Sequence, residues 1–220
     1  MKIGVITDRR KGFSPPVPQC DILLFGGGQL GTVDYASELS GKSDKLENMA
    51  NFSHLAECGV LCGCVTDSRG LKRKSVAVAS EGKLLGISDM LYVLDGEEYK
   101  SGATLGVYSV GGYKVGVCIE NDLRFPECIN ALSLYGCNIV AVFCEDMSDG
   151  IAPLLIRSYA YLYGIPFVMA GNGVAYFADI TGGIASSNND IALFEAPIKN
   201  CYRVVTARRK GIFCGSVPDF

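Results

Sequence analysis

The chain contains a single histidine, no apolar run of membrane-spanning length and no excess of basic residues. Lys and Arg number 20 against 23 Asp and Glu, so the formal net charge is -3. A nucleic-acid partner would require a basic stripe, and a membrane-spanning helix would require about 20 apolar residues, so we expect neither partner. The start at Met1–Asp8 turns polar too soon for a signal peptide. These absences predict a soluble, cytoplasmic protein.

The overall composition is that of a globular domain. Hydrophobic residues make up 49% of the 220 residues and charged residues 20%, which excludes a disordered chain, a fibre or a coiled coil. The length fits one domain of ordinary size. We therefore predict a single domain that spans residues 1–220.

The ten cysteines do not indicate a disulfide scaffold or a metal site. Disulfide scaffolds are expected mainly in small secreted chains. Cys62-Gly-Cys64 resembles half a metal site, but no second pair follows at a suitable spacing, and His54 lies alone in a predicted helix. Residues two apart on a strand point to the same face, so both thiols are expected to fill the core. We predict no metal and no cofactor.

The element order predicts a layered α/β protein. Helices are expected from about Ser43 to before Gly59, from Pro126 to before Gly136, and over Ile151–Tyr163. The paired glycines of Val110-Gly-Gly-Tyr113 predict a hairpin. Strands are expected at Lys2–Asp8, Asp21–Gly26, Val60–Thr66, Ser75–Ala79, Leu105–Val110, Tyr113–Glu120, Asn138–Cys144, Pro166–Ala170, Ile191–Glu195 and Tyr202–Ala207. Hairpins alternate with β-α-β segments, which favours a mixed sheet or two sheets.

One segment carries a family resemblance. The run Tyr113-Lys-Val-Gly-Val-Cys-Ile-Glu-Asn-Asp-Leu-Arg-Phe-Pro-Glu127 resembles the signature of the nitrilase, or carbon–nitrogen hydrolase, superfamily. Weaker similarity in the same order covers Leu55–Gly86 and Gly164–Ser186. The resemblance implies a four-layer α-β-β-α sandwich, a homodimer or higher oligomer, and a small amide-like ligand.

The family's chemistry needs a cysteine nucleophile, a glutamate base and a lysine. The base removes the thiol proton, the thiolate attacks a nitrile or amide carbon, and the lysine stabilises the developing negative charge. The resemblance places the nucleophile at Glu120, the base at Gly27 and the lysine at Asp89. All three positions are therefore substituted.

These substitutions predict a pseudoenzyme that binds a ligand or a partner. A carboxylate at residue 120 is a poor nucleophile toward an unactivated amide and repels an oxyanion. Asp89 reverses the charge of the lysine, and Gly27 offers no proton acceptor. Cys118, an alternative nucleophile, lies two residues behind Glu120 on the same side of the strand and is expected to fill the core.

Two alternatives remain open. The first is an active hydrolase with relocated residues, drawn from Cys118, Glu120, Asp89, Lys83, Lys100 and Lys114. The second is a cation-binding module, because carboxylates at strand ends bind hard cations; its candidate ligands are Glu120, Asp89, Glu145 and Asp146.

Overall fold

Two β-sheets form the centre of the molecule. The computed structural model describes residues 1–8, 12–13, 17–26, 28–145 and 150–198. The first sheet has the strand order β13-β1-β2-β4-β5-β6, with β3 paired to β4. Its strands are β1 (Lys2–Ile6), β2 (Ile22–Phe25), β3 (Thr32–Asp34), β4 (Gly59–Ser68), β5 (Leu71–Ser80), β6 (Lys83–Asp89) and β13 (Ile191–Glu195).

The second sheet has the order β12-β11-β10-β9-β8-β7. Its strands are β7 (Val107–Val110), β8 (Tyr113–Ile119), β9 (Ile139–Phe143), β10 (Phe167–Ala170), β11 (Ala175–Ala178) and β12 (Ile184–Ser187). Strands β8, β9 and β10 are parallel to one another, as are β1, β2 and β4 in the first sheet. Hairpins add the antiparallel strands β5, β6, β7, β11 and β12, whereas β13 comes from the far end of the described chain and pairs antiparallel with β1.

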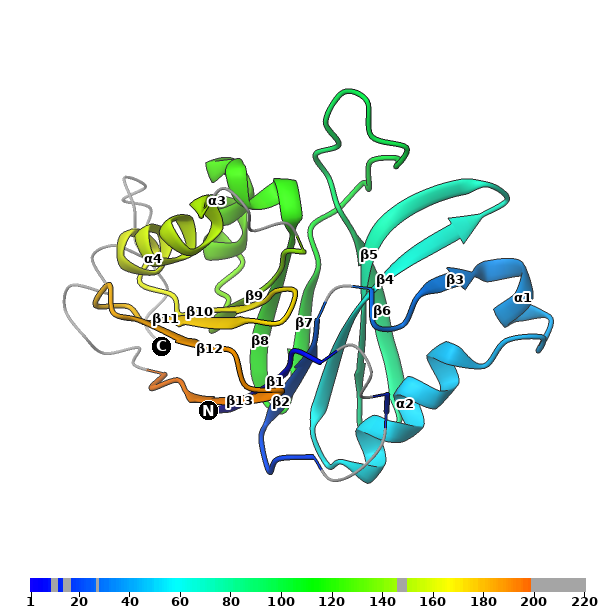
Figure 1. The fold of residues 1–220 in the computed structure, drawn as a ribbon, viewed down its shortest axis with the longest axis horizontal. Coiled ribbons are helices and arrows are strands. Elements are labelled where there is room, and N and C mark those ends of the chain that lie inside the picture. The colour runs from blue at the N-terminus through cyan, green and yellow to red at the C-terminus, as the bar shows by residue number, and fades with distance from the viewer. Residues whose placement is uncertain (9–11, 14–16, 27, 146–149, 199–220) are drawn as a thin grey trace.

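Helices cover the outer face of each sheet (Figure 1). Helix α2 (Lys45–Leu55) packs on the first sheet, and α3 (Pro126–Leu134) and α4 (Ile151–Tyr163) pack on the second. A short α1 (Tyr35–Leu39) follows β3, and a 3₁₀ turn (Glu120–Arg124) follows β8. The predicted four-layer α-β-β-α sandwich is confirmed.

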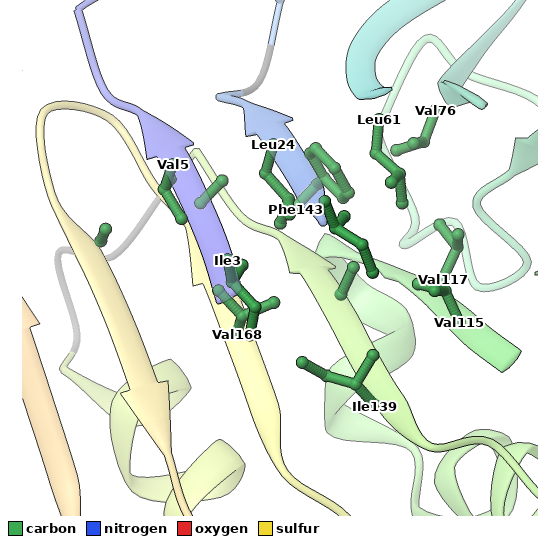
Figure 2. Packing of buried hydrophobic residues seen from close by; sticks show 14 of the residues in the cluster. Ile3, Val5, Leu24, Leu61, Val76, Val115, Val117, Ile139, Phe143 and Val168 are labelled. Carbon is green, nitrogen blue, oxygen red and sulfur yellow. The ribbon is translucent and has the colours of Figure 1, made fainter. Parts of the chain in front are cut away.

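The core between the sheets is apolar and drawn from both of them. Figure 2 shows Ile3, Val5 and Leu24 of the first sheet beside Phe143 and Val168 of the second. All of these side chains are at most 2% exposed. Burial of each one contributes about 1.5–3 kcal/mol, so this layer holds the two sheets in a fixed relation.

Most predicted elements are confirmed, and the missed ones share a cause. Helix α4 has the predicted bounds, and Gly111 and Gly112 form the predicted hairpin turn with positive φ. The sequence pattern does not predict β3, α1 or the edge strand β6, because these segments are short or mostly exposed and lack a clear apolar period. The strands β11 and β12 fall largely within Gly164–Ser186, which only the family resemblance covered. The predicted strand Tyr202–Ala207 lies outside the described residues.

The predicted core placement of the cysteines agrees with the structure. Cys62, Cys64 and Cys118 are at most 4% exposed, and the described cysteines form no disulfide with one another. His54 lies on the exposed side of α2. Within the described ranges, no group of three or more His, Cys, Asp or Glu residues is arranged to hold a metal ion. No helix of the described chain is both long and apolar enough to cross a membrane.

The contact between Gly59 and Val110 gives a test of the sheet packing. A Cβ atom at Gly59 would lie 1.8 Å from Val110 Cγ1, across the gap between the sheets. We expect Gly59→Ala to lower the free energy of unfolding by about 1–3 kcal/mol, because overpacking forces the backbone or Val110 to move. Urea unfolding measures the change.

Two further variants make this test specific. Gly59→Ala combined with Val110→Ala should cost less than the sum of the single changes, because the clash is removed. Gly12→Ala serves as the control, since no atom lies within 4 Å of its added Cβ. Equal losses in Gly59→Ala and Gly12→Ala would contradict the packing described here.

Candidate functional site

The carboxyl ends of parallel strands from both sheets meet at one cavity. Strand β2 ends at the glycine turn that includes Gly28, β8 ends at Glu120, and β9 ends just before Glu145. The cavity has a volume of about 50 Å³ and is lined by Gly28, Gly63, Cys64, Val65, Lys74, Ser75, Tyr99, Ile119, Glu120, Phe143 and Glu145. Ligand sites in α/β proteins gather at such strand ends.

Glu120 lies at the sharp turn between β8 and α3. Its backbone has φ +42°, a left-handed conformation that non-glycine residues seldom adopt. Strain of this kind clusters at functional sites, where the surrounding structure holds it. The turn directs the Glu120 side chain into the cavity, and that side chain is 14% exposed.

Lys74 supplies a cation that the sequence reading missed. Its ammonium forms a hydrogen-bonded ion pair with Glu120 Oε2, lies 3.9 Å from Glu97 Oε1, and sits 5.1 Å from the centre of the Tyr99 ring. Burial acts to lower the pKa of Lys74, but the hydrogen bond and charge of Glu120, with Glu97, outweigh it and raise the pKa overall. The side chain is therefore a fixed positive charge.

A larger cavity of about 330 Å³ lies on the other side of this ion pair. Lys74, Glu120 and Glu97 line it together with the apolar side chains Leu94, Leu123, Ala152 and Leu155 and with Asn121, Arg124 and Cys144. Lys74 and Glu120 thus belong to the walls of both cavities. The ion pair is thus common to both cavities, and the leucines give the larger one an apolar stretch of wall.

Asp89 stands behind the cavity wall. Its carboxylate accepts a hydrogen bond of 2.6 Å from Ser75 Oγ and lies 3.8 Å from Arg73 Nε. Ser75 lines the small cavity, whereas Asp89 is not among the residues lining it. Asp89 and Lys74 lie on neighbouring strands, since Ser75 pairs with Asp89 and Met90 N–H donates to Lys74 O.

The sequence-predicted lysines do not line either cavity that contains Glu120. Lys83 begins β6, Lys114 is the second residue of β8 and lies far from its carboxyl end, and Lys100 donates its backbone N–H to Lys72 O. Lys74 was not predicted as a site residue because it ends a run of three basic residues, Lys72-Arg-Lys74, and such runs are usually exposed to solvent. Its position directly before the buried run Ser75–Ser80 is the signal that could have found it.

Gly27 and Asp146 lie outside the described residues. The flanking Gly28 is described, and a Cβ atom placed there would lie 2.9 Å from Glu145 Oε1. The Glu145 carboxylate therefore lies against Gly28, just after the end of β2. A second carboxylate lies in the cavity as a result, supplied by the strand next to β8.

Two thiols lie near the site, and burial keeps both protonated. Cys118 is fully buried behind the turn, and this burial raises its pKa well above the usual thiol value. Cys64 lines the small cavity, and burial raises its pKa to about 12. Reactive cysteines need a lowered pKa, so neither thiol is activated.

Comparison with solved structures identifies the architecture. An amidase from Nesterenkonia sp. matches with a TM-score of 0.69 and 14% identity over 94% of this chain and 95% of that one. A mutant of the Nesterenkonia AN1 amidase, described as from the nitrilase superfamily, matches with a TM-score of 0.69 and 14% identity over 88% of each chain. The chain has the nitrilase-superfamily fold. No family model and no curated protein matches the sequence.

A buried carboxylate holds the turn after β8 in place. Asp122 accepts hydrogen bonds from Leu91 N–H at 2.9 Å and from Tyr92 N–H at 2.8 Å, and so joins the turn to the segment after β6. Burial raises the pKa of Asp122 to about 6, although these hydrogen bonds act to lower it. Asp122 is thus a positioning residue of the turn.

The raised pKa of Asp122 predicts a pH dependence of stability. Between about pH 4 and pH 6 the folded state binds more protons at Asp122 than the unfolded state, so its contribution to stability falls as pH rises. Asp122→Asn keeps an acceptor for the two N–H groups and removes the titration. We expect the free energy of unfolding of the wild type, relative to Asp122→Asn, to drop by up to about 3 kcal/mol from pH 4 to pH 7. Urea unfolding at several pH values checks this, and a flat difference would contradict it.

Proposed function

We propose that residues 1–220 form one carbon–nitrogen-hydrolase-like domain that binds a small amide-like ligand and does not perform thiol-dependent hydrolysis. The ion pair between Lys74 and Glu120 carries the proposal. It puts a carboxylate where the family resemblance expects the thiol, and it commits the nearby ammonium to that carboxylate. A carboxylate at this place repels the oxyanion that a hydrolase would have to stabilise.

The charges around the cavity match the two ends of a primary amide. An amide carbonyl accepts hydrogen bonds and its NH₂ group donates two. Lys74 offers donors, and Glu120 and Glu145 offer acceptors around the same small space. A neutral amide can pair with the ammonium and with the carboxylates without adding charge. A carboxylate ligand would instead lie beside the negative charges of Glu120 and Glu145.

The sizes of the two cavities indicate where the rest of such a ligand would lie. A space of about 50 Å³ holds only a polar head group or a few waters. The neighbouring space of about 330 Å³ is at the lower end of the usual range for small-molecule sites, and Leu94, Leu123 and Leu155 give it an apolar wall. A short aliphatic amide fits this division, with its amide at the ion pair and its chain against the leucines.

Two small amides are suitable probes because of the solved structures of similar fold. A Nesterenkonia amidase variant is described in complex with butyramide, and another in complex with acrylamide. We transfer these ligands to the present chain only as probes, since the identity is 14%.

Butyramide is expected to bind, and butyrate is expected not to bind. Lys74→Met and Glu120→Gln should each weaken butyramide binding about tenfold or more, because each removes a charged hydrogen-bonding partner of the amide. Isothermal titration calorimetry measures the dissociation constants.

The control for this experiment is Lys72→Met. Lys72 lies on the same strand, its side chain is 44% exposed, and its ammonium lies 4.0 Å from Glu98 Oε2. Its replacement should leave butyramide binding unchanged. Equal binding of butyrate and butyramide, or equal effects of Lys74→Met and Lys72→Met, would refute the proposal.

A second candidate is an active hydrolase with relocated residues. The observation that favours it is the meeting of Cys64, Lys74, Glu120 and Glu145 around one cavity. Against it, Cys64 is 4% exposed, and its pKa of about 12 leaves roughly one thiol in 10⁵ ionised at neutral pH. Burial and the charge of Asp89 both raise this pKa.

Ammonia release separates the two candidates. We expect no release from butyramide or butyronitrile above the buffer rate, and no acrylamide adduct on Cys64 by mass spectrometry. Cys64→Ala should behave as the wild type does. Release that Cys64→Ala abolishes would establish the relocated hydrolase, and release that Glu120→Gln abolishes would indicate chemistry at the carboxylate.

The cation-binding alternative is less favoured by the charges. The ammonium of Lys74 lies beside Glu120 and Glu97, where a metal ion would need to bind, and it repels one. Self-association as a homodimer or higher oligomer and a cytoplasmic location rest on the sequence and stay predictions.

A further inference from the structure

The long connection between β6 and β7 contributes to both cavities that contain Glu120. The described residues 90–106 join the two strands without a helix or strand of their own, and Figure 1 shows them as the green loop at the top of the molecule. Leu94 and Glu97 of this connection line the larger cavity, and Tyr99 lines the smaller one. Loops longer than about 12–15 residues usually have a function, such as covering a binding site.

Both ends of this connection are fixed to the body of the protein. Near the first end, the Tyr92 ring stacks on Phe125 with centroids 3.7 Å apart. Near the second end, Lys100 N–H donates a hydrogen bond of 2.8 Å to Lys72 O. Residues 93–98 lie between these anchors, so they can move while both anchors stay in place.

The segment between the anchors contains one compact unit. Glu97 N–H donates to Leu94 O at 3.2 Å and closes a β-turn, and Gly96 has the positive φ, +92°, that suits the third position of a type II turn. The Glu97 carboxylate accepts a hydrogen bond of 3.0 Å from Leu94 N–H. Leu94 and Glu97 are thus bonded to each other in both directions and move together.

The Glu97 carboxylate also holds this unit against the wall of the cavity. Its Oε2 accepts a hydrogen bond of 3.1 Å from Asn121 Nδ2, and its Oε1 lies 3.9 Å from the Lys74 ammonium. The side chains of Glu97 and Lys74 are 26% and 23% exposed, so water competes for these contacts and they break at low cost. Leu94 beside them is 48% exposed.

We propose that residues 93–98 form a lid over the larger cavity, which opens to admit the ligand when Glu97 releases Asn121 and Lys74. The inference rests on the amide binding proposed above for this cavity. Glu97 is the latch of the lid, and Leu94 is the apolar side chain that the lid lays on the ligand. The aliphatic chain of a bound amide covers part of the exposed Leu94 surface, so binding favours the closed lid.

Cys144 reports the opening of the lid when no amide is present. It lines the larger cavity and is 7% exposed. Cys62 and Cys118 are fully buried and are not among the lining residues of either cavity. A small uncharged thiol reagent, methyl methanethiosulfonate, reaches Cys144 once the lid opens, whereas it reaches Cys62 or Cys118 only after the core opens.

The labelling rate of Cys144 in the full chain, measured by peptide mapping, tests the latch. We expect Glu97→Ala to raise this rate about tenfold, because it removes a hydrogen bond and an ion pair that hold the lid closed. Glu98→Ala is the matched control. Glu98 lies beside Glu97, its side chain is 68% exposed, and it lies 4.0 Å from Lys72, so its loss should change the rate less than about twofold.

Salt provides a test that needs no variant. Raising the sodium chloride concentration should speed Cys144 labelling in the wild type, because salt screens the attraction between Glu97 and Lys74. The same change should leave the rate of Glu97→Ala unaltered. The response of the wild type therefore tests the latch even where Glu97→Ala does not fold.

Butyramide separates the lid from the proposed function. It should slow the labelling of Cys144 in the wild type. A rate unaffected by butyramide but raised in Glu97→Ala would refute amide binding and support the lid. Equal rates in the wild type, Glu97→Ala and Glu98→Ala, or no labelling of Cys144 in any of them, would overturn the lid. Labelling of Cys62 at the rate of Cys144 would also overturn it, since the opening would then involve the core.

Discussion

The apolar contact between the two sheets is the constraint on which the site depends. Ile3 and Leu24 of one sheet face Val117 and Phe143 of the other in a single buried cluster. Close-packed interiors tolerate little displacement, so this layer fixes how far apart the strand ends lie. Gly28 from one sheet and Glu120 from the other can line one cavity only because the two sheets are held in this relation.

Lys74 shows how a cation can reach the turn at Glu120 from the strand next to Asp89. Asp89 occupies the place that the family resemblance gives to the lysine, and Lys74 stands on the neighbouring antiparallel strand. Adjacent strands are about 4.8 Å apart, a distance that a lysine side chain covers. The ammonium therefore reaches the turn at Glu120 from the next strand. Desolvation offsets much of the attraction in a largely buried pair, so the pair fixes geometry more than it adds stability.

Local signals predicted much of the fold, and contacts between distant segments account for what was missed. Gly150 and Gly164, both with positive φ, flank α4, so its bounds could be read from the sequence. The pairing of Lys74 with Glu120 spans 46 residues and depends on the register of two sheets, which no local pattern encodes. The edge strand β6 is mostly exposed and gives no apolar alternation, so the strand was missed and Asp89 at its end was singled out by the resemblance alone.

The structure also shows that the most specific motif has a structural role of its own. In the run Asp122-Leu-Arg-Phe-Pro126, Asp122 accepts backbone hydrogen bonds from Leu91 and Tyr92, and Phe125 stacks on the Tyr92 ring with centroids 3.7 Å apart. Pro126 begins α3, where its missing N–H costs nothing. These contacts hold residue 120 in a left-handed conformation that costs about 1–2 kcal/mol for a non-glycine residue. The motif therefore builds the turn, and its presence indicates the scaffold whether or not a thiol stands at residue 120.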